Sequence, residues 1–255
     1  MSEALPRAAL VTGAGKRIGR ALARDLARQG FAVAVHYRSS AAEAASLVAE
    51  IAAAGGRATA LEADLAVESE TMGLLARAEA ALGPIGLLVN SAARFERDEL
   101  ASATRASWDL HLETNLRAPF VLTQEFARRL PPAAEGLVVN LLDQRVLRLT
   151  PHYVSYTVSK SALWTLTRSL ALALAPRIRV NAIAPGPTLP GTHQSQAQFE
   201  RQWRTTLLGR GATLDELCAA LRFILETRSL TGQIISLDGG HHAGGPPTPG
   251  SGARG

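Results

Sequence analysis

Near the N-terminus, a short apolar segment leads through a glycine-rich turn into a helical pattern and then into a second apolar segment. These four pieces cover residues 8–11, 12–19, 20–29 and 31–37. The turn carries Gly13, Gly15 and Gly19, so its spacing departs from the usual G-x-G-x-x-G. A strand, a glycine-rich turn, a helix and a strand in this order place backbone N–H groups where they can hold a pyrophosphate. The segment therefore predicts a dinucleotide-binding unit.

The alternation of apolar segments and helical patterns continues along the chain. The further strands that we expect are 58–63, 86–90, 136–142, 179–184 and 233–237, and the further helices are 41–54, 69–82, 104–113, 116–129, 154–175 and 214–226. Strands that alternate with helices of this length imply parallel βαβ units and a doubly wound, Rossmann-like sheet. We therefore expect a single α/β domain whose ligands gather at the C-terminal ends of the strands.

Two segments stand apart from this pattern. Residues 188–210 have weak periodicity and carry His193, Phe199 and Trp203, so we expect a lid or substrate loop there. Residues 244–255 are rich in Gly, Pro and Ser, which predicts a flexible tail. The predicted domain is therefore 1–243.

Composition narrows the class of protein. Cys218 is the only cysteine, so no intrachain disulfide can form. The start of the chain lacks the layout of a signal peptide, and no apolar run approaches a membrane-spanning length. The net charge of +5 could indicate an anionic partner, but the arginines are scattered without a basic run or interleaved aromatic residues. We expect a cytoplasmic protein with no nucleic-acid or membrane partner.

The end of the second strand indicates which dinucleotide is bound. A chain that prefers NAD usually places Asp or Glu there, to accept hydrogen bonds from the adenosine ribose. This chain instead has His36, Tyr37, Arg38 and Ser39, and it has Arg17 in the glycine-rich turn. Cations and hydroxyl groups suit a 2′-phosphate, through charge-assisted hydrogen bonds. The residues favour NADP(H), although Arg38 could also be an ordinary surface residue of a turn.

The helix expected at 154–175 carries Tyr156 and Lys160, four residues apart and therefore on one face. A neighbouring ammonium favours the phenolate and can lower the pKa of the phenol, which would make Tyr156 a proton donor and acceptor near neutral pH. The only lysines in the chain are Lys16 and Lys160. Both fall in the two motifs described above.

Together these motifs resemble the short-chain dehydrogenase/reductase superfamily over residues 8–240. The resemblance rests on the turn with Gly13, Arg17 and Gly19, on Asp64, Asn90, Asn115, Tyr156-x-x-x-Lys160 and Pro185-Gly186, and on Asp238-Gly239-Gly240. It implies a seven-stranded sheet of order 3-2-1-4-5-6-7 and, commonly, a homotetramer. It also implies that Tyr156 is the general acid, that Lys160 lowers its pKa and holds the nicotinamide ribose, and that Asn115 supports a proton-relaying water chain. The expected cofactor-binding residues are Gly13, Lys16, Arg17, Ile18, Gly19, His36, Tyr37, Arg38, Ser39, Asp64, Leu65, Asn90, Ala92, Tyr156, Lys160, Pro185 and Gly186.

Three departures from the superfamily pattern resemble pteridine reductases and similar bacterial dihydropteridine reductases. Arg17 replaces a glycine, Phe95 follows the Asn90 turn, and Asp143 stands where a serine usually lies thirteen residues before the tyrosine. The resemblance implies that Phe95 sandwiches a pterin ring against the nicotinamide and that Asp143 and Tyr156 contact the substrate. Ala93 departs from a serine often found in that turn, so the side chain at this position has no hydroxyl to hydrogen-bond the cofactor or the pterin.

The chemistry of the Asp143 carboxyl group also indicates which kind of bond the site reduces. Reduction of a ketone builds negative charge on oxygen, which a nearby carboxylate would oppose. Reduction of a C=N bond requires a proton on nitrogen, so a carboxyl group could supply that proton or stabilise an iminium. The alternative reading of Asp143 is a strand-end residue that caps backbone N–H groups. Phe95, likewise, could be a core residue, and no metal site is expected from His241-His242.

Three functions remain open from the sequence. The leading hypothesis is an NADPH-dependent reductase of a dihydropterin. The second is a carbonyl or 3-oxoacyl thioester reductase of the same superfamily, and the third is a non-catalytic NADP(H)-binding protein.

Overall fold

Seven parallel strands form one sheet in the order β3-β2-β1-β4-β5-β6-β7 in the computed structural model, which describes residues 5–191 and 194–244. This is the predicted order, and it confirms the single-domain, Rossmann-like α/β fold. The strands are β1 (Ala8–Val11), β2 (Ala32–Tyr37), β3 (Ala58–Glu62), β4 (Leu87–Asn90), β5 (Gly136–Leu141), β6 (Ile178–Pro185) and β7 (Ile234–Leu237).

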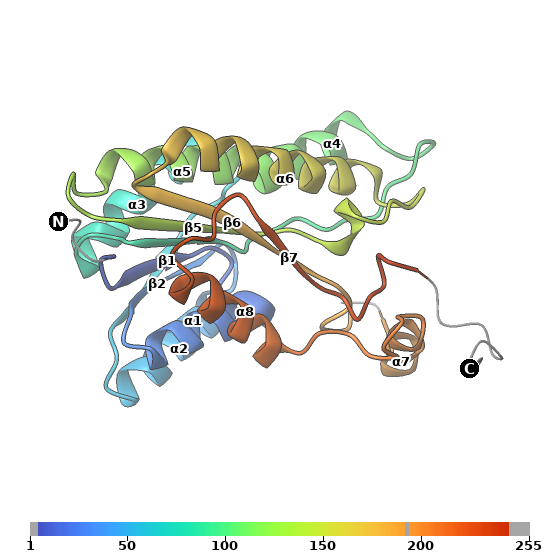
Figure 1. Ribbon diagram of the computed structural model, residues 1–255, viewed down its shortest axis with the longest axis horizontal. Coiled ribbons are helices and arrows are strands. Elements are labelled where there is room, and N and C mark those ends of the chain that lie inside the picture. The colour runs from blue at the N-terminus through green and yellow to red at the C-terminus, as the bar shows by residue number, and fades with distance from the viewer. Residues whose placement is uncertain (1–4, 192–193, 245–255) are drawn as a thin grey trace.

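Helices cover both faces of the sheet (Figure 1). One face carries α1 (Arg17–Arg28), α2 (Ala41–Ala53) and α8 (Leu214–Glu226). The other carries α3 (Glu68–Leu82), α4 (Arg105–Leu112), α5 (Ala118–Arg129) and α6 (Val154–Leu174). A core of buried side chains fills each side: Leu22 and Leu217 belong to the first, and Leu74 and Phe126 to the second. The central strands are buried on both faces, which explains their continuous apolar sequences.

The position of the site follows from the strand order. β1 pairs with β2 on one side and with β4 on the other. The chain therefore builds the sheet outward from β1 in one direction through β2 and β3, and then in the opposite direction from β4 onward. In an open α/β sheet, ligands bind in the crevice outside the carboxyl ends of the strands at such a switch point. The glycine-rich turn after β1 and the segment after β4 flank this crevice.

The structure differs from the sequence expectations at two places. A break was expected at Asn115, but a π-helical segment, Glu113–Arg117, joins α4 to α5 without interruption. The segment 188–210 contains α7 (Gln196–Arg204), which begins with a capping box between Ser195 and Gln198. The α7 helix has only 9 residues, so it contains too few apolar side chains for a clear helical periodicity in the sequence. His193 and residues 245–255 of the expected tail lie outside the described residues.

No helix in the described ranges combines the length and the apolar character that a membrane crossing requires.

Candidate active site

A cavity of about 460 Å³ lies at the C-terminal ends of the central strands. It brings together the glycine-rich turn, the ends of β2 and β3, the segment after β4 and the face of α6 that carries Tyr156. Most of the residues that the sequence singled out line its wall: Gly13, Lys16, Arg17, Ile18, Gly19, His36, Arg38, Asp64, Leu65, Ala92, Phe95, Asp143, Tyr156, Lys160, Pro185 and Gly186.

At one end of the cavity the backbone is packed too closely for side chains. A Cβ atom on Gly13 would lie 2.9 Å from the Cα atom of Ala92, and one on Gly19 would lie 2.4 Å from the carbonyl oxygen of Gly13. Gly13 also has a φ of +64°, which favours glycine. The turn therefore exposes bare backbone at the start of α1, as a pyrophosphate-binding turn requires.

His36 fixes the shape of this turn. Its Nδ1 accepts a hydrogen bond from the Gly13 N–H group at 3.0 Å, and its Nε2 lies 3.1 Å from the carbonyl oxygen of Ala63. Nε2 therefore carries the proton and donates it to Ala63. Burial lowers the pKa of His36 to about 4, so the ring is neutral at physiological pH. His36 thus acts by tying the turn to the ends of β2 and β3.

Three cations lie around the same end. Arg38 is exposed at the wall and makes no hydrogen bond or ion pair to any residue in the ranges 5–191 and 194–244. Lys16 pairs with Glu43 at 2.7 Å. Arg17 donates hydrogen bonds to the carbonyl oxygens of Pro190 (2.9 Å) and Leu189 (3.4 Å). Arg17 therefore connects the glycine-rich turn to the start of the 188–210 segment.

This donor set fits NADP(H). The bare backbone suits the pyrophosphate, and the guanidinium of Arg38 at the end of β2 suits a 2′-phosphate. No carboxylate follows β2 directly to favour an unphosphorylated ribose.

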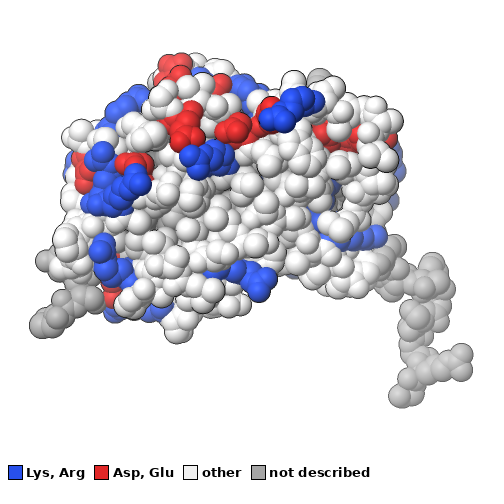
Figure 2. Space-filling view, turned by 90° about the horizontal axis from the view of Figure 1, so that it is seen from above, with Lys and Arg blue, Asp and Glu red and all other residues white. Residues whose placement is uncertain are grey.

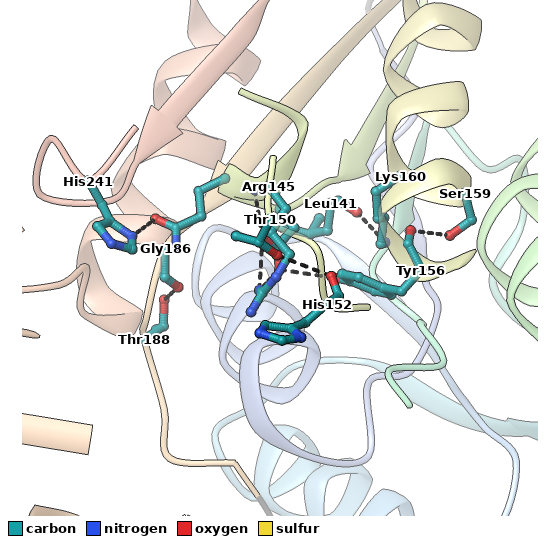
Figure 3. Close-up of polar contacts among 12 residues, drawn as sticks. Leu141, Arg145, Thr150, His152, Tyr156, Ser159, Lys160, Gly186, Thr188 and His241 are labelled. Atoms are coloured by element: carbon teal, nitrogen blue, oxygen red, sulfur yellow. Dashed lines mark hydrogen bonds and ion pairs between the residues drawn. The ribbon is translucent and has the colours of Figure 1, made fainter. Parts of the chain in front are cut away.

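The other end of the cavity holds the polar residues of α6 and β5. The Tyr156 hydroxyl donates a hydrogen bond to Asp143 Oδ2 at 3.1 Å, and the Lys160 ammonium donates to the carbonyl oxygen of Leu141 at 2.7 Å. Figure 3 shows Tyr156 and Lys160 projecting from one helix toward the strand end with Leu141. Both side chains are buried. The i, i+4 spacing thus places them together, as the sequence predicted.

The expected effect of Lys160 on Tyr156 is not what this arrangement shows. Burial and the Asp143 carboxylate raise the pKa of the Tyr156 phenol well above its usual value, and Lys160 bonds Leu141 instead of the phenol. Burial also lowers the pKa of Lys160 to about 8. The prediction of a lowered phenol pKa is therefore wrong. The phenol holds its proton at neutral pH and points it at Asp143.

Two residues of this end were not found from the sequence. Arg145 lies 3.4 Å from Asp143 and also lies over the Phe95 and Tyr153 rings, at 5.4 and 4.8 Å from their centroids. Tyr153 stacks on Phe95 with centroids 4.5 Å apart and rings 5° from parallel. Tyr153 has a φ of +60°, which costs about 1–2 kcal/mol in a residue other than glycine. Neither residue belongs to a spaced motif, although Arg145 follows Asp143 by only two positions.

Phe95 lies at the cavity wall beside the acid pair. Its ring meets the Tyr156 ring edge-on, with centroids 4.7 Å apart, and 49% of the residue is exposed. The alternative that Phe95 is a core residue is therefore excluded. A half-exposed ring next to Tyr156 can stack a flat ligand.

Four expected site residues do not line the cavity. Tyr37 directs its hydroxyl to Glu62 at 3.5 Å, and Ser39 is exposed. Asn90 is buried and donates to Asn140, so it ties β4 to β5. The Asn115 amide accepts from the backbone N–H of Arg94 at 2.8 Å and donates to the Arg94 carbonyl oxygen at 3.0 Å. Asn115 thus fixes the backbone directly before Phe95.

The histidine pair after β7 makes local contacts. His242 pairs with Asp238 at 2.8 Å, and His241 Nδ1 lies 3.0 Å from Gln144 Oε1. Within residues 5–191 and 194–244, no group of three or more His, Cys, Asp or Glu side chains could hold a metal ion.

Comparison with known proteins agrees with this geometry. The enoyl-(acyl carrier protein) reductase family matches residues 13–242. The 3-oxoacyl-(acyl-carrier-protein) reductase FabG of Staphylococcus aureus is 30% identical over 92% of this chain and 98% of its own length.

Two solved structures are more similar in sequence. The crystal structure of FolM alternative dihydrofolate reductase 1 from Brucella canis, complexed with NADP, has 46% identity and a TM-score of 0.92 over 97% of this chain and 98% of that chain. Its counterpart from Brucella suis, also with NADP, has 47% identity and a TM-score of 0.90 over 92% of this chain and 95% of that chain. With the strand order and the cavity described above, these matches show that the chain belongs to the short-chain dehydrogenase/reductase superfamily and is an NADP-dependent oxidoreductase.

Proposed function

We propose that the protein reduces the C=N bond of a dihydropterin with NADPH. The observation that carries this proposal is the 3.1 Å hydrogen bond from the Tyr156 phenol to the Asp143 carboxylate. A carboxylate at this position opposes the oxyanion that forms when a ketone is reduced, whereas it stabilises a protonated C=N group. The two Brucella structures, whose names describe dihydrofolate reductases, support the same class of substrate.

NADPH, when bound, would supply the hydride for the substrate carbon. The protein's own residues then have to deliver a proton to the substrate nitrogen. Tyr156 holds a proton at neutral pH and lies at the cavity wall, so its phenol is the proposed proton donor. Burial and Asp143 raise the pKa of the phenol, and the Arg145 guanidinium partly offsets this rise. It would thereby stabilise the phenolate left after the transfer.

The contacts of Asp143 favour one of the two roles that the sequence left open. Its oxygens accept hydrogen bonds from Tyr156, from the backbone N–H of Arg145 at 2.8 Å and from the Arg145 guanidinium at 3.4 Å. Three donors directed at one carboxyl group suit an ionised acceptor. We therefore assign Asp143 to charge stabilisation of an iminium-like nitrogen, and the proton to Tyr156.

Phe95 is the proposed platform for the pterin ring. Its ring is half exposed, lies beside Tyr156 and is backed by Tyr153. A flat bicyclic substrate stacked on Phe95 would have its reacting bond near the phenol. Stacking on Phe95 would distinguish poorly between pterins that carry different ring substituents. The choice among pterins, and the acceptance of folates, would then depend on residues around the entrance of the cavity.

Preference for NADPH should depend on Arg38. Replacing Arg38 with alanine is expected to weaken NADPH binding by about 10- to 100-fold, because a charge-assisted hydrogen bond is worth about 1.5–3 kcal/mol. Binding of NADH, which has no 2′-phosphate, should change little. Titration of both cofactors by nicotinamide fluorescence measures the two effects. An equal loss for both cofactors would contradict the role of Arg38. Arg57, an exposed arginine outside the cavity wall, provides the matched control Arg57→Ala.

The activity itself is tested by following NADPH oxidation with dihydrobiopterin, dihydromonapterin and dihydrofolate. Turnover of at least one of them is expected. The competing activity is carbonyl reduction, which the match to FabG supports. Turnover of a β-ketoacyl thioester or a simple ketone, with no turnover of any dihydropterin, would favour that function.

We also propose that the protein is a homotetramer. The outer face of α6 carries Val158, Thr165, Leu172 and Ala173, and Arg168 is the only exposed charged residue of this helix. Figure 2 shows charged side chains around the margins of the face seen from above, most densely along one edge, and a broad central area almost without them. An extended uncharged surface of this kind suits subunit contact. The cytoplasmic location expected from the sequence stays a prediction.

A further inference from the structure

A second polar cluster lies behind the active site and has no place in the mechanism above. It consists of Asp98, His111 and Ser155, all almost fully buried, and is called here the Asp98 cluster. Its three members come from the segment after β4, from α4 and from the first turn of α6. Ser155 directly precedes Tyr156, and Asp98 follows Phe95 by three positions.

The hydrogen bonds of the cluster have a fixed direction. The backbone N–H of Glu96 donates to His111 Nε2 at 3.1 Å, so the ring proton must lie on Nδ1. His111 Nδ1 lies 2.7 Å from Ser155 Oγ and donates to it, and Ser155 Oγ in turn donates to Asp98 Oδ2. Burial lowers the pKa of His111, which agrees with a neutral ring.

Asp98 also caps the start of α6. The helix begins after Tyr153, whose side chain makes no capping hydrogen bond. Asp98 replaces this local cap: its Oδ1 accepts from the Ser155 N–H at 3.1 Å, and its carbonyl oxygen accepts from the Tyr153 N–H at 2.7 Å. These bonds hold Tyr153 in its left-handed conformation, and that conformation places its ring against Phe95.

His111 is the member that contacts both sides of the active site. Through Glu96 it holds the backbone directly after Phe95, while Asn115 holds the backbone directly before it. Through Ser155 it holds the turn of α6 that carries Tyr156. Its ring also packs against the Tyr156 ring, with centroids 5.9 Å apart and planes at 71°.

We propose that His111 is a positioning residue that sets the distance between the Phe95 platform and the Tyr156 phenol. This positioning role rests on the proposed function, because it takes Phe95 as the platform for the substrate. His111 is fully buried and does not line the cavity, so it acts through Glu96 and Ser155 and touches no substrate.

Two substitutions separate the two bonds of His111. His111→Asn places an amide N–H where Nδ1 was, so it retains the bond to Ser155 and loses the bond to Glu96. His111→Gln reaches the Nε2 position, so it retains an acceptor for Glu96 and loses the bond to Ser155. Loss of one hydrogen bond of about 1 kcal/mol corresponds to about fivefold. We expect His111→Asn to raise the KM for dihydropterin about fivefold with a smaller change in kcat, and His111→Gln to lower kcat about fivefold with a smaller change in KM.

The experiment compares both variants with the wild type in NADPH oxidation with dihydrobiopterin, and it measures NADPH affinity and the thermal midpoint of each. NADPH affinity should be unchanged, because none of the cluster's hydrogen bonds involves the glycine-rich turn or Arg38. His152→Gln, an exposed histidine outside the cluster, is the matched control and should behave as the wild type. If a His111 variant does not fold, Ser155→Ala tests the bond between His111 and the α6 turn that carries Tyr156. This variant keeps the backbone N–H groups of Tyr153 and Ser155 that donate to Asp98, and it should lower kcat.

The outcomes distinguish this proposal from the proposed function. A wild type that turns over no dihydropterin contradicts the function. A wild type that is active, with variants that lose only thermal stability while kcat and KM stay unchanged, overturns the positioning role. The opposed changes in KM and kcat support it, and parallel changes of both constants in both variants would overturn it.

Discussion

Replacing Tyr156 with phenylalanine should lower kcat by about 100- to 10,000-fold, the usual contribution of a general acid. The substitution removes one oxygen atom and keeps the ring that packs against Phe95 and His111. The shape of the cavity should therefore survive, and the dissociation constants of NADPH and dihydropterin should change little. The loss should lie in the chemical step, because the phenol is the only proton donor that the proposed mechanism uses.

Rapid mixing of the variant with NADPH and substrate measures this step in a single turnover. A tight cofactor complex with a slow single turnover is the expected result. A kcat within threefold of the wild type would show that another group delivers the proton. The non-catalytic alternative predicts no turnover in the wild type either, so the wild-type rate separates it from the proposal.

Replacing Asp143 with serine should have opposite effects on two kinds of substrate. For a dihydropterin, kcat/KM should fall roughly a hundredfold, since one preorganised charge next to the reacting group is lost. For a ketone, the serine hydroxyl could donate to the developing oxyanion, so the rate should be preserved or should rise. Asp143→Asn keeps the shape and the acceptor for Arg145 but removes the charge, and it should resemble Asp143→Ser with the dihydropterin.

The matched control is Asp109→Ser. Asp109 lies on α4, is half exposed and pairs with Arg105 at 2.6 Å, away from the cavity wall. It should leave both activities unchanged. A parallel loss of dihydropterin and ketone reduction in Asp143→Ser would mean that Asp143 only holds Arg145 and the strand end, as the capping alternative states.

The parts of the site that were predictable depend on local spacing. The i, i+4 pair of Tyr156 and Lys160 needs only a regular helix, and the glycine-rich turn needs only its neighbouring strand and helix. Such patterns place side chains without knowledge of distant contacts. These motifs carry the resemblance to the superfamily, and that resemblance implied the strand order. The structure confirms the order.

The remaining features depend on contacts between distant segments. Tyr153 reaches Phe95 through a left-handed backbone conformation that no sequence pattern marks. His111 is an ordinary helical histidine until α4, the Phe95 segment and α6 come together. The raised pKa of Tyr156 likewise depends on its burial and on the direction of the Asp143 side chain, neither of which follows from the spacing.

The central claim is that this site reduces a C=N bond, and the position of the transferred hydride tests it most directly. NADPH that carries deuterium at the transferred position is incubated with the wild-type protein and dihydrobiopterin, and the product is analysed by NMR and mass spectrometry. The account predicts tetrahydrobiopterin with one deuterium on the ring carbon of the former C=N bond. The same incubation is run in parallel with dihydromonapterin, with dihydrofolate and with a β-ketoacyl thioester. No transfer to any of the three dihydropterins, together with deuterium on the carbinol carbon of the reduced thioester, would contradict the account.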